Sequence, residues 1–151
     1  LIVRGVSDTF REETVGKVHL VFLPPVEDHA DLYPPEADVI LMPRRYGGLS
    51  LVMGEAQSLG LPVLASDVAP WNERPGLELL PTEDPPVYDG MSGGSIAMHT
   101  VDARDLAAGI DDLTRAPGRV ATLSRASDHW ARANSWNALK SLWVETLGLD
   151  P

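Results

Sequence analysis

The stretch "ADVILMPRRYGGLSLVMGEAQSLGLPVLAS" (residues 37–66) constrains the fold more than any other part of the chain. It opens with a nearly continuous apolar run at 37–42, which predicts a strand buried on both faces, as strands of parallel sheets are. A loop with two glycines follows, then a helix predicted at about 50–59, with Gly60 as its C-cap. The apolar run at 62–66 predicts the next strand. Strand, helix and strand joined by short loops favour a parallel sheet with right-handed crossovers.

The segments before this stretch are shorter and more polar. Apolar, β-branched runs at 1–5 and 17–23 predict two strands. Between them, residues 7–15 have room for only a short helix. Residues 26–33 predict about two further helical turns, which end at the prolines that follow.

The second half is predicted to be mostly loop over 69–95, which is rich in Pro, Gly and acidic residues, with one short strand at 95–99. Three helices are predicted to close the chain. They span 103–114 with Asp102 as N-cap, 117–131 with a proline in the first turn, and 136–147 with Ser135 as N-cap. The last of them carries an apolar stripe made of Trp136, Leu139, Trp143 and Leu147.

Length and composition exclude several classes of protein. A chain of 151 residues is long enough for one domain with its own core, and we expect a single domain over 1–151. We find no apolar run near the ~20 residues that a transmembrane helix needs. The formal net charge of -10 argues against a nucleic-acid partner. The absence of cysteine suits a cytoplasmic protein. The four histidines lack metal-ligand spacing, so no metal site is predicted.

The glycine-containing loop before the helix at 50–59 is the candidate site. In an open parallel sheet, ligands bind at loops that lead from the carboxyl ends of strands into helices. Gly47 and Gly48 let a ligand come close to the backbone, and the first amides of a helix attract anions. Arg44 and Arg45 are candidates to add positive charge. Glu55 would repel phosphate, but its two oxygens match the vicinal hydroxyls of a ribose.

Each of these features also has an ordinary interpretation. Two glycines before a helix are often just a turn, and spacing alone leaves both interpretations open. Arg44 and Arg45 are equally typical of surface charge, and a lone Glu in a helix is usually solvated. Trp71 lies in a loop after a buried strand, which makes it a candidate to pack over a ligand.

Taken together, these motifs resemble the donor-binding segment of the group 1 (family 4-like) retaining glycosyltransferases of the GT-B fold. In that family an "ADV" strand, a Pro, a Gly-containing loop, a Gly-Leu helix start, an "EA" pair and "G-hydrophobic-PV" follow one another, as they do here over residues 37–73. "VHLVFLPPV" stands where the family has its base-binding strand and loop. "SIAMHTVDARDLAAGIDDL" and "ARANSWNALKSLWVETL" resemble its later strand and helices, so the resemblance spans nearly the whole chain.

The resemblance implies an α/β fold with a Rossmann-like parallel sheet flanked by helices, as the C-terminal half of a GT-B enzyme. It implies transfer of a hexose from a nucleotide-diphosphate sugar to an unknown acceptor, with retention and without a metal or other cofactor. The expected partners are the nucleotide sugar and an N-terminal domain of the same protein. Glu55 matches the family's ribose-binding Glu. The matched diphosphate and sugar contacts are Gly47, Gly48, Leu49, Ser50 and Leu51, with Arg44 nearby, and the matched base contacts are Leu23, Pro24, Pro25 and Val26.

Two departures from the family pattern bear on activity. The first Glu of the family's pair, which contacts the donor sugar or assists at its reacting face, falls at Gly47, so the catalytic residue is unknown. The family's Arg and Lys that neutralise the diphosphate match no position in this chain, because they precede its first strand. We therefore expect a fragment of a longer protein that binds a nucleotide weakly but does not catalyse transfer.

Two other functions compete with this one. The chain is also compatible with a degenerate half that binds a nucleotide sugar or a partner without catalysis. An epimerase of the same fold is a further alternative, although the sequence offers no clear pair of acid and base residues for it.

Overall fold

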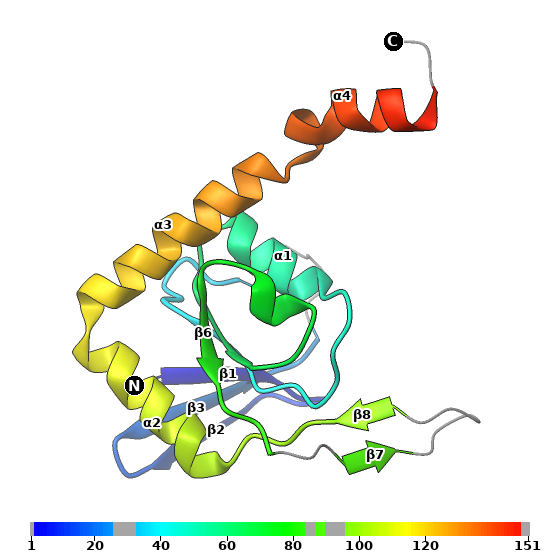
Figure 1. Cartoon of the computed structure of the whole chain (residues 1–151). Helices are drawn as coiled ribbons and strands as arrows, with labels where there is room; N and C mark the ends of the chain where they lie inside the picture. Colours follow the sequence, from blue (N-terminus) through cyan, green and yellow to red (C-terminus); the bar gives the residue numbers. More distant parts are fainter. Residues whose placement is uncertain (1, 26–32, 84–86, 90–95, 149–151) are drawn as a thin grey trace. The chain divides into compact units, whose positions relative to one another are not determined.

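The computed structural model describes residues 2–25, 33–83, 87–89 and 96–148 (Figure 1). The chain forms two compact units, Leu1–Glu36 and Ala37–Pro151, and each is described by itself. The single domain expected over 1–151 stays a prediction. The helical turns predicted at 26–33 fall almost entirely outside the described residues.

The first unit is a small three-stranded sheet. Its strands are β1 (Ile2–Val6), β2 (Arg11–Val15) and β3 (Val18–Leu23), in the order β1-β3-β2. β1 pairs with β3 in parallel, and β2 pairs with β3 antiparallel. The two strands predicted from the apolar runs are therefore confirmed.

The short helix predicted at 7–15 is wrong, because Arg11–Val15 forms β2. Gly16, with a φ of 61°, lies in the tight turn between β2 and β3, where a positive φ matches the twist of a hairpin. The guanidinium of Arg11 lies 4.0 Å from the centre of the Phe22 ring, directly across the strand pair. All five residues of β2 are exposed, so the strand carries none of the alternation that would have predicted it.

The second unit is built on a parallel sheet of three strands. β4 (Ile40–Met42), β5 (Val63–Ser66) and β6 (Leu77–Leu80) lie in that order, and both pairings are parallel. All four residues of the central strand β5 are buried, as the continuous apolar run predicts. The α/β class with a parallel sheet flanked by helices is thus confirmed.

The segment 69–95, predicted to be mostly loop, contains more structure than expected. A short 3₁₀ helix (Trp71–Glu73) precedes β6, and β7 (Val87–Asp89) pairs antiparallel with β8 (Ile96–Met98). β6 has only four residues, and the prolines and glycine around it concealed a strand that its pairing with β5 stabilises. The strand predicted at 95–99 is confirmed as β8.

The helices are α1 (Leu51–Ser58), α2 (Ala103–Arg115), α3 (Pro117–Ala133) and α4 (Trp136–Leu147). The predicted N-caps are confirmed: the Asp102 side chain accepts from the Arg104 N–H at 2.7 Å, and the Ser135 side chain accepts from the Ala138 N–H at 3.3 Å. α1 has its C-cap at Leu59, and Gly60 follows in the left-handed region with a φ of 71°. Gly60, the predicted C-cap, thus stands one place beyond the observed C-cap, where a left-handed glycine commonly ends a helix.

The core of the second unit joins the sheet to α2 and α3. Leu64 of β5, Leu80 of β6 and Leu113 of α2 are buried together. The partly buried side chains packed around them are Val39, Leu41, Val101, Leu106, Ile110, Val120 and Leu123. α1 packs against α3, and its Met53 and Ala56 are fully buried. The start of α1 is therefore held on a fixed support.

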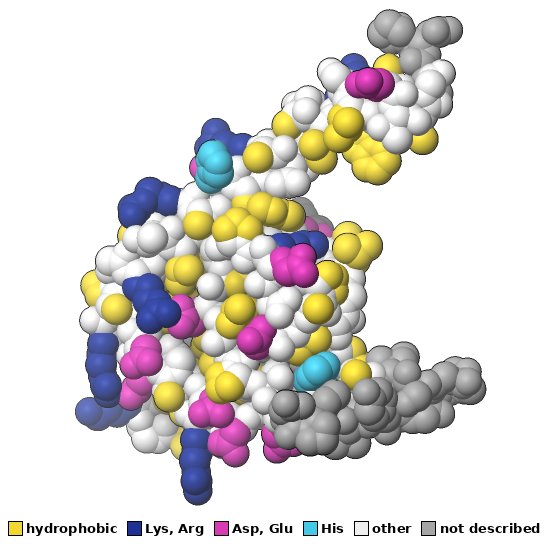
Figure 2. Space-filling view, in the orientation of Figure 1, with side chains coloured by type: hydrophobic (Ala, Val, Ile, Leu, Met, Phe, Trp, Pro, Cys, Tyr) yellow, Lys and Arg dark blue, Asp and Glu magenta, His cyan; other side chains and the backbone are white. Residues whose placement is uncertain are grey.

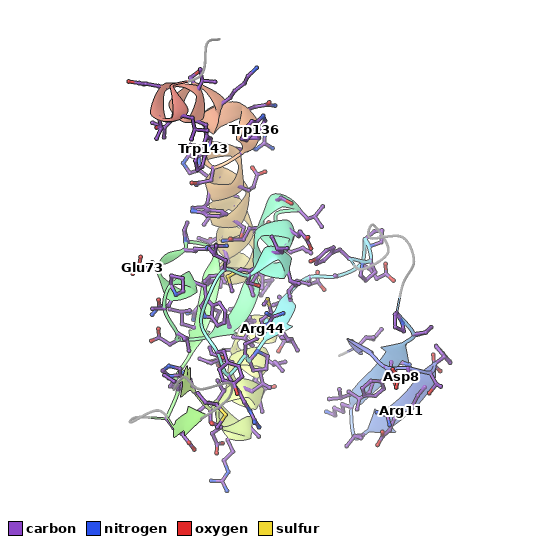
Figure 3. The ribbon with its side chains drawn as sticks, turned by 90° about the vertical axis from the view of Figure 1, so that its right-hand side faces the viewer. Asp8, Arg11, Arg44, Glu73, Trp136 and Trp143 are labelled. Atoms are coloured by element: carbon purple, nitrogen blue, oxygen red, sulfur yellow. The ribbon has the colours of Figure 1, made fainter. Side chains whose placement is uncertain are left out.

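The apolar stripe predicted on α4 forms, but no residue of this helix is buried. Trp136 is 67% exposed and Leu147 is 60% exposed, and Leu142 adds a further exposed apolar side chain. Figure 2 shows hydrophobic side chains along this helix, and Figure 3 labels Trp136 and Trp143 on it. Among the described residues, none of the helices is long and apolar enough to cross a membrane. The expected cytoplasmic location stays a prediction.

Gly76→Ala tests how the sheet is joined to α3. Gly76 has a φ of 81°, and a Cβ there would overlap the Oγ of Ser127. We expect this variant to lose roughly 2–4 kcal/mol in its free energy of unfolding, from backbone strain and overpacking together. The measurement is urea-induced unfolding followed by circular dichroism.

The matched control is Gly118→Ala, because nothing lies within 4 Å of a Cβ at this position in α3. Its free energy of unfolding should be unchanged or higher by up to about 1 kcal/mol. Equal destabilisation of the two variants would contradict the packing of Gly76 against Ser127.

Candidate functional site

The candidate site lies at the carboxyl edge of the parallel sheet in the second unit. β4 ends at Met42, and the loop 43–49 carries the chain from there to the start of α1. β5 ends at Ser66, beside β4, and the chain leaves it at the same edge. Loops at this edge are the usual ligand-binding elements of open parallel sheets.

Hydrogen bonds fix the loop 43–49 to its neighbours. The buried hydroxyl of Ser66 donates to the Arg44 carbonyl oxygen at 2.7 Å. The backbone N–H of His99, just after β8, donates to the Arg45 carbonyl oxygen at 2.7 Å. The loop after β4 is thus held from two sides.

Trp71 supports this arrangement instead of covering a ligand. Its side chain is only 2% exposed, and its indole N–H donates to the Ser66 carbonyl oxygen at 2.9 Å. A ring with so little exposed surface has no free face for a ligand. The prediction that Trp71 packs over a ligand is therefore wrong, and this side chain belongs to the core.

Both glycines of the loop are required by its conformation. A Cβ added at Gly47 would overlap the carbonyl oxygen of Ala69 and lie 3.2 Å from a methyl group of Val68. Gly48 has a φ of 122°, which side-chain-bearing residues rarely adopt. The position that matches the family's first Glu therefore has no room for any side chain in this backbone.

Ser50 is the N-cap of α1, directly before the first helical residue, whereas the helix was predicted to start at about position 50. Its side chain is 5% exposed and accepts from the Met53 N–H at 3.3 Å, and its carbonyl oxygen accepts from the Gly54 N–H at 3.2 Å. This cap fixes the direction of the first helical turn. Leu49 and Leu51, on either side of Ser50, are 88% and 82% exposed. The start of α1 is therefore rigid but open to solvent.

A groove of about 380 Å³ runs from this start along one side of α1. Its lining comes from α1 and the residue before its cap, from the loop after the 3₁₀ helix, and from α3: Leu49, Ser50, Leu51, Gly54, Glu55, Ser58, Arg74 and Trp130. A groove of this size is within the range of ligand sites, roughly 300–1,000 Å³. The structure thus brings four of the predicted residues together, and they are Leu49, Ser50, Leu51 and Glu55.

Four lining residues were not predicted. Gly54 and Ser58 follow Leu51 and Glu55 at helical spacing, so the periodicity of α1 was a usable signal for them. Arg74 and Trp130 come from distant parts of the chain, and their proximity depends on the packing of α3 against α1. The guanidinium of Arg74 lies 4.8 Å from the centre of the Trp130 ring.

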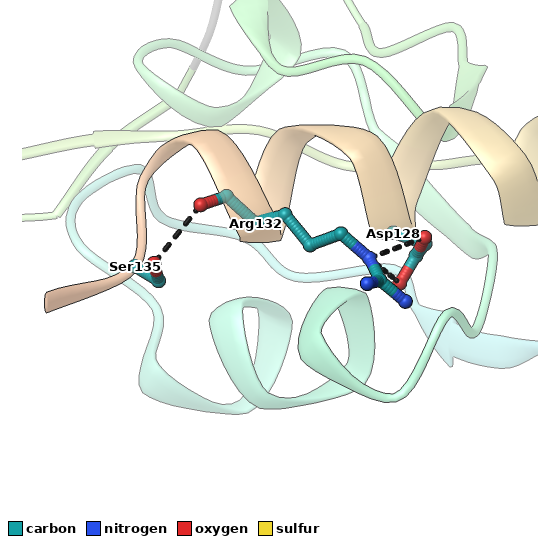
Figure 4. A network of polar contacts seen from close by, with 3 residues as sticks. All are labelled: Asp128, Arg132 and Ser135. Atoms are coloured by element: carbon teal, nitrogen blue, oxygen red, sulfur yellow. Dashed lines mark hydrogen bonds and ion pairs between the residues drawn. The ribbon is translucent and has the colours of Figure 1, made fainter. Parts of the chain in front are cut away.

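The end of α3 that carries Trp130 is held by polar contacts (Figure 4). Arg132 Nε donates to both carboxylate oxygens of Asp128, at 2.9 and 2.8 Å. The hydroxyl of Ser135 donates to the Arg132 carbonyl oxygen at 2.9 Å, and the Asn134 side chain donates to the Trp130 carbonyl oxygen at 2.8 Å. These bonds close the last turn of the helix, so the backbone of Trp130 is well supported.

The two arginines of the loop do not line the groove. Arg44 is exposed (labelled in Figure 3), and the Arg45 guanidinium donates to the sulfur of Met98 at 3.9 Å. A role for Arg44 in donor binding stays a prediction.

The predicted base contacts belong to the first unit. Leu23 is the last residue of β3, Pro24 and Pro25 are exposed, and Val26 lies outside the described residues. These contacts stay predictions. Among the residues that the structure describes, no group of three or more His, Asp or Glu could hold a metal ion. The expectation that no metal is needed also stays a prediction.

A parallel α/β sheet with a glycine-containing loop and a capped helix at its carboxyl edge belongs to the open α/β folds, which bind their ligands at that edge. Comparison with protein families identifies the particular family. The chain matches the family of group 1 glycosyl transferases over residues 2–116, and it belongs to that family. The comparisons with curated proteins and with solved structures found no match. The chain therefore has a domain of the glycosyltransferase type.

Gly47→Ala tests the fit of the loop against Ala69. We expect the added methyl group to lower the free energy of unfolding by roughly 1–3 kcal/mol, because it must displace a backbone carbonyl group. The measurement is urea-induced unfolding, with Gly54→Ala in α1 as control, since a Cβ there meets nothing within 4 Å. Destabilisation by Gly54→Ala alone would refute the close contact at Gly47.

Proposed function

We propose that this chain is the donor-binding half of a glycosyltransferase that transfers a hexose from a nucleotide-diphosphate sugar to an acceptor, with retention. The observation that carries the proposal is the position of Glu55. This carboxylate lines a groove that begins at Leu49, directly after the two glycines, and at the start of α1. A site with backbone amides at one end and a carboxylate one turn further along suits a ligand with phosphates and vicinal hydroxyls.

In this proposal, the backbone amides of residues 48–51 bind the diphosphate. Glu55 accepts hydrogen bonds from the ribose hydroxyls. The contribution of the chain to catalysis is electrostatic. Groups that bind the diphosphate stabilise the negative charge that develops on the leaving nucleotide as the glycosidic bond breaks.

An N-terminal domain of the same protein would supply the acceptor site and further cations for the diphosphate. The exposed apolar face of α4 supports a role for this helix in contact with another domain. Large apolar side chains gathered on one exposed face are typical of interaction surfaces, and Trp136 and Trp143 are 67% and 46% exposed.

A second candidate function is a non-catalytic module that binds a nucleotide sugar or a partner. The conformation at Gly47 favours it, because the family's first carboxylate is missing and the backbone of Ala69 occupies its place. The two functions share the nucleotide site and differ in whether the sugar is transferred.

Glu55→Ala tests the donor site that both candidates share. We expect the variant to bind a nucleoside diphosphate roughly ten- to a hundredfold more weakly, because hydrogen bonds to a charged group contribute about 1.5–3 kcal/mol. The measurement is calorimetric titration of the 151-residue chain with UDP, GDP and ADP and with their glucose or mannose conjugates.

The control is Glu145→Ala, on an exposed part of α4, which should leave the dissociation constants unchanged. Tighter binding of a sugar conjugate than of its nucleotide would support a donor site that contacts the sugar despite Gly47, which both candidates share. If the wild-type chain binds none of these ligands, the donor site is refuted and a protein-interaction module is favoured.

A further inference from the structure

We propose that Arg74, held over the ring of Trp130, is a diphosphate-binding cation of the groove. This inference rests on the proposed function, because it assigns a part of the same ligand to a residue outside the glycine loop. It also names a source of positive charge within this chain.

The backbone around Arg74 is fixed on both sides. The Arg74 N–H donates to the Trp71 carbonyl oxygen at 2.9 Å, and Trp71 is buried in the core. The carbonyl oxygen of Pro75 accepts from the side chain of Gln57 at 2.7 Å, and Gln57 is fully buried in α1. Arg74 therefore starts from a well-defined position beside α1.

The side chain of Arg74 is also oriented. Its guanidinium lies 4.8 Å from the centre of the Trp130 ring, within the range of a cation–π interaction. A guanidinium stacked on an aromatic face keeps its edge N–H groups available for hydrogen bonds to a second partner. The ring thus positions the charge without neutralising it.

Three other arginines of the second unit are paired with carboxylates. These ion pairs are Arg115 with Asp111, Arg119 with Glu78 and Arg132 with Asp128, at distances of 2.6–2.8 Å. Within the described parts of the chain, no carboxylate forms such a pair with Arg74. Of the residues that line the groove, Arg74 is the cation and Glu55 is the anion.

The two charges together define the chemistry of the ligand. A carboxylate repels a phosphate next to it but accepts hydrogen bonds from hydroxyls, while the planar fork of Arg binds two phosphate oxygens at once. A ligand that satisfies both needs an anionic part for Arg74 and hydroxyls for Glu55. A nucleoside diphosphate has both, whereas a free sugar lacks the anion and inorganic diphosphate lacks the hydroxyls.

The test compares each nucleoside with its diphosphate. Uridine and UDP, guanosine and GDP, and adenosine and ADP are titrated into the 151-residue chain by calorimetry. For the base that binds best, we expect Arg74→Ala to raise the dissociation constant of the diphosphate at least roughly tenfold and to change that of the nucleoside less than about twofold. Arg74→Lys keeps the positive charge but not the planar fork of donors. We expect its dissociation constant for the diphosphate to lie between those of the wild type and of Arg74→Ala.

Arg125→Ala is the matched control, since this exposed arginine of α3 bonds to Thr122 and does not line the groove. It should bind like the wild type. Thermal unfolding of every variant shows that it is folded, and Arg74→Lys serves as the working variant if Arg74→Ala is not.

Three results would overturn the proposal. If Arg74→Ala binds the diphosphate like the wild type while Glu55→Ala does not, Arg74 has no role and the donor site stands. If Arg74→Ala weakens nucleoside and diphosphate equally, Arg74 does not act on the phosphates. If the wild-type chain binds no nucleoside diphosphate, the donor site itself fails, and this inference fails with it.

Discussion

The hydrogen bond from the Ser66 hydroxyl to the Arg44 carbonyl oxygen is the contact on which the site depends. It joins the end of the buried central strand β5 to the loop that follows β4. Because β5 is enclosed by both neighbours and by the core, its last residue is a fixed point. The loop 43–49 takes its position from that point, and α1 begins where the loop ends. The groove along α1 is therefore placed by the sheet rather than by the loop alone.

The sequence predicted the elements whose signals are local. The caps Ser50, Asp102 and Ser135 fix helix starts by bonding to amides two or three residues away, and two of them, Asp102 and Ser135, were predicted as N-caps. β5 was predicted because a strand buried on both faces must be apolar throughout. β2 and β6 were missed because they are stabilised by pairing with a neighbouring strand. β2 is exposed along its whole length, and β6 has only four residues between turn-forming segments. Their own residues carry no periodic signal.

The residues of the candidate site also form two groups: those that a local sequence pattern predicted, and those that only tertiary packing brings together. Leu49, Ser50, Leu51 and Glu55 lie within one short segment, so the resemblance to a family motif located them. Arg74 and Trp130 meet only because α3 packs against α1 and the loop before β6 is bound to Gln57. A single sequence contains no pattern that predicts a contact between residues so far apart in the chain. In α4 the sequence predicted an apolar stripe, and the structure leaves that stripe exposed. Periodicity predicts which residues share a face, but not what covers it.

Gly47 shows why the missing carboxylate is more than a point substitution. The loss of a side chain at this position lets the loop 43–49 approach the backbone at Ala69, and that approach then excludes any side chain from returning. The chain has a formal net charge of -10, so it does not attract an anion from a distance. Charges more than about 10 Å apart are screened at moderate ionic strength, and binding then depends on the groups inside the groove. With no carboxylate at position 47, the glycine end of the site adds no negative charge to oppose a diphosphate. The packing of Gly47 against Ala69 thus leaves position 47 without a carboxylate, and of the residues that line the groove Arg74 is the cation and Glu55 is the anion.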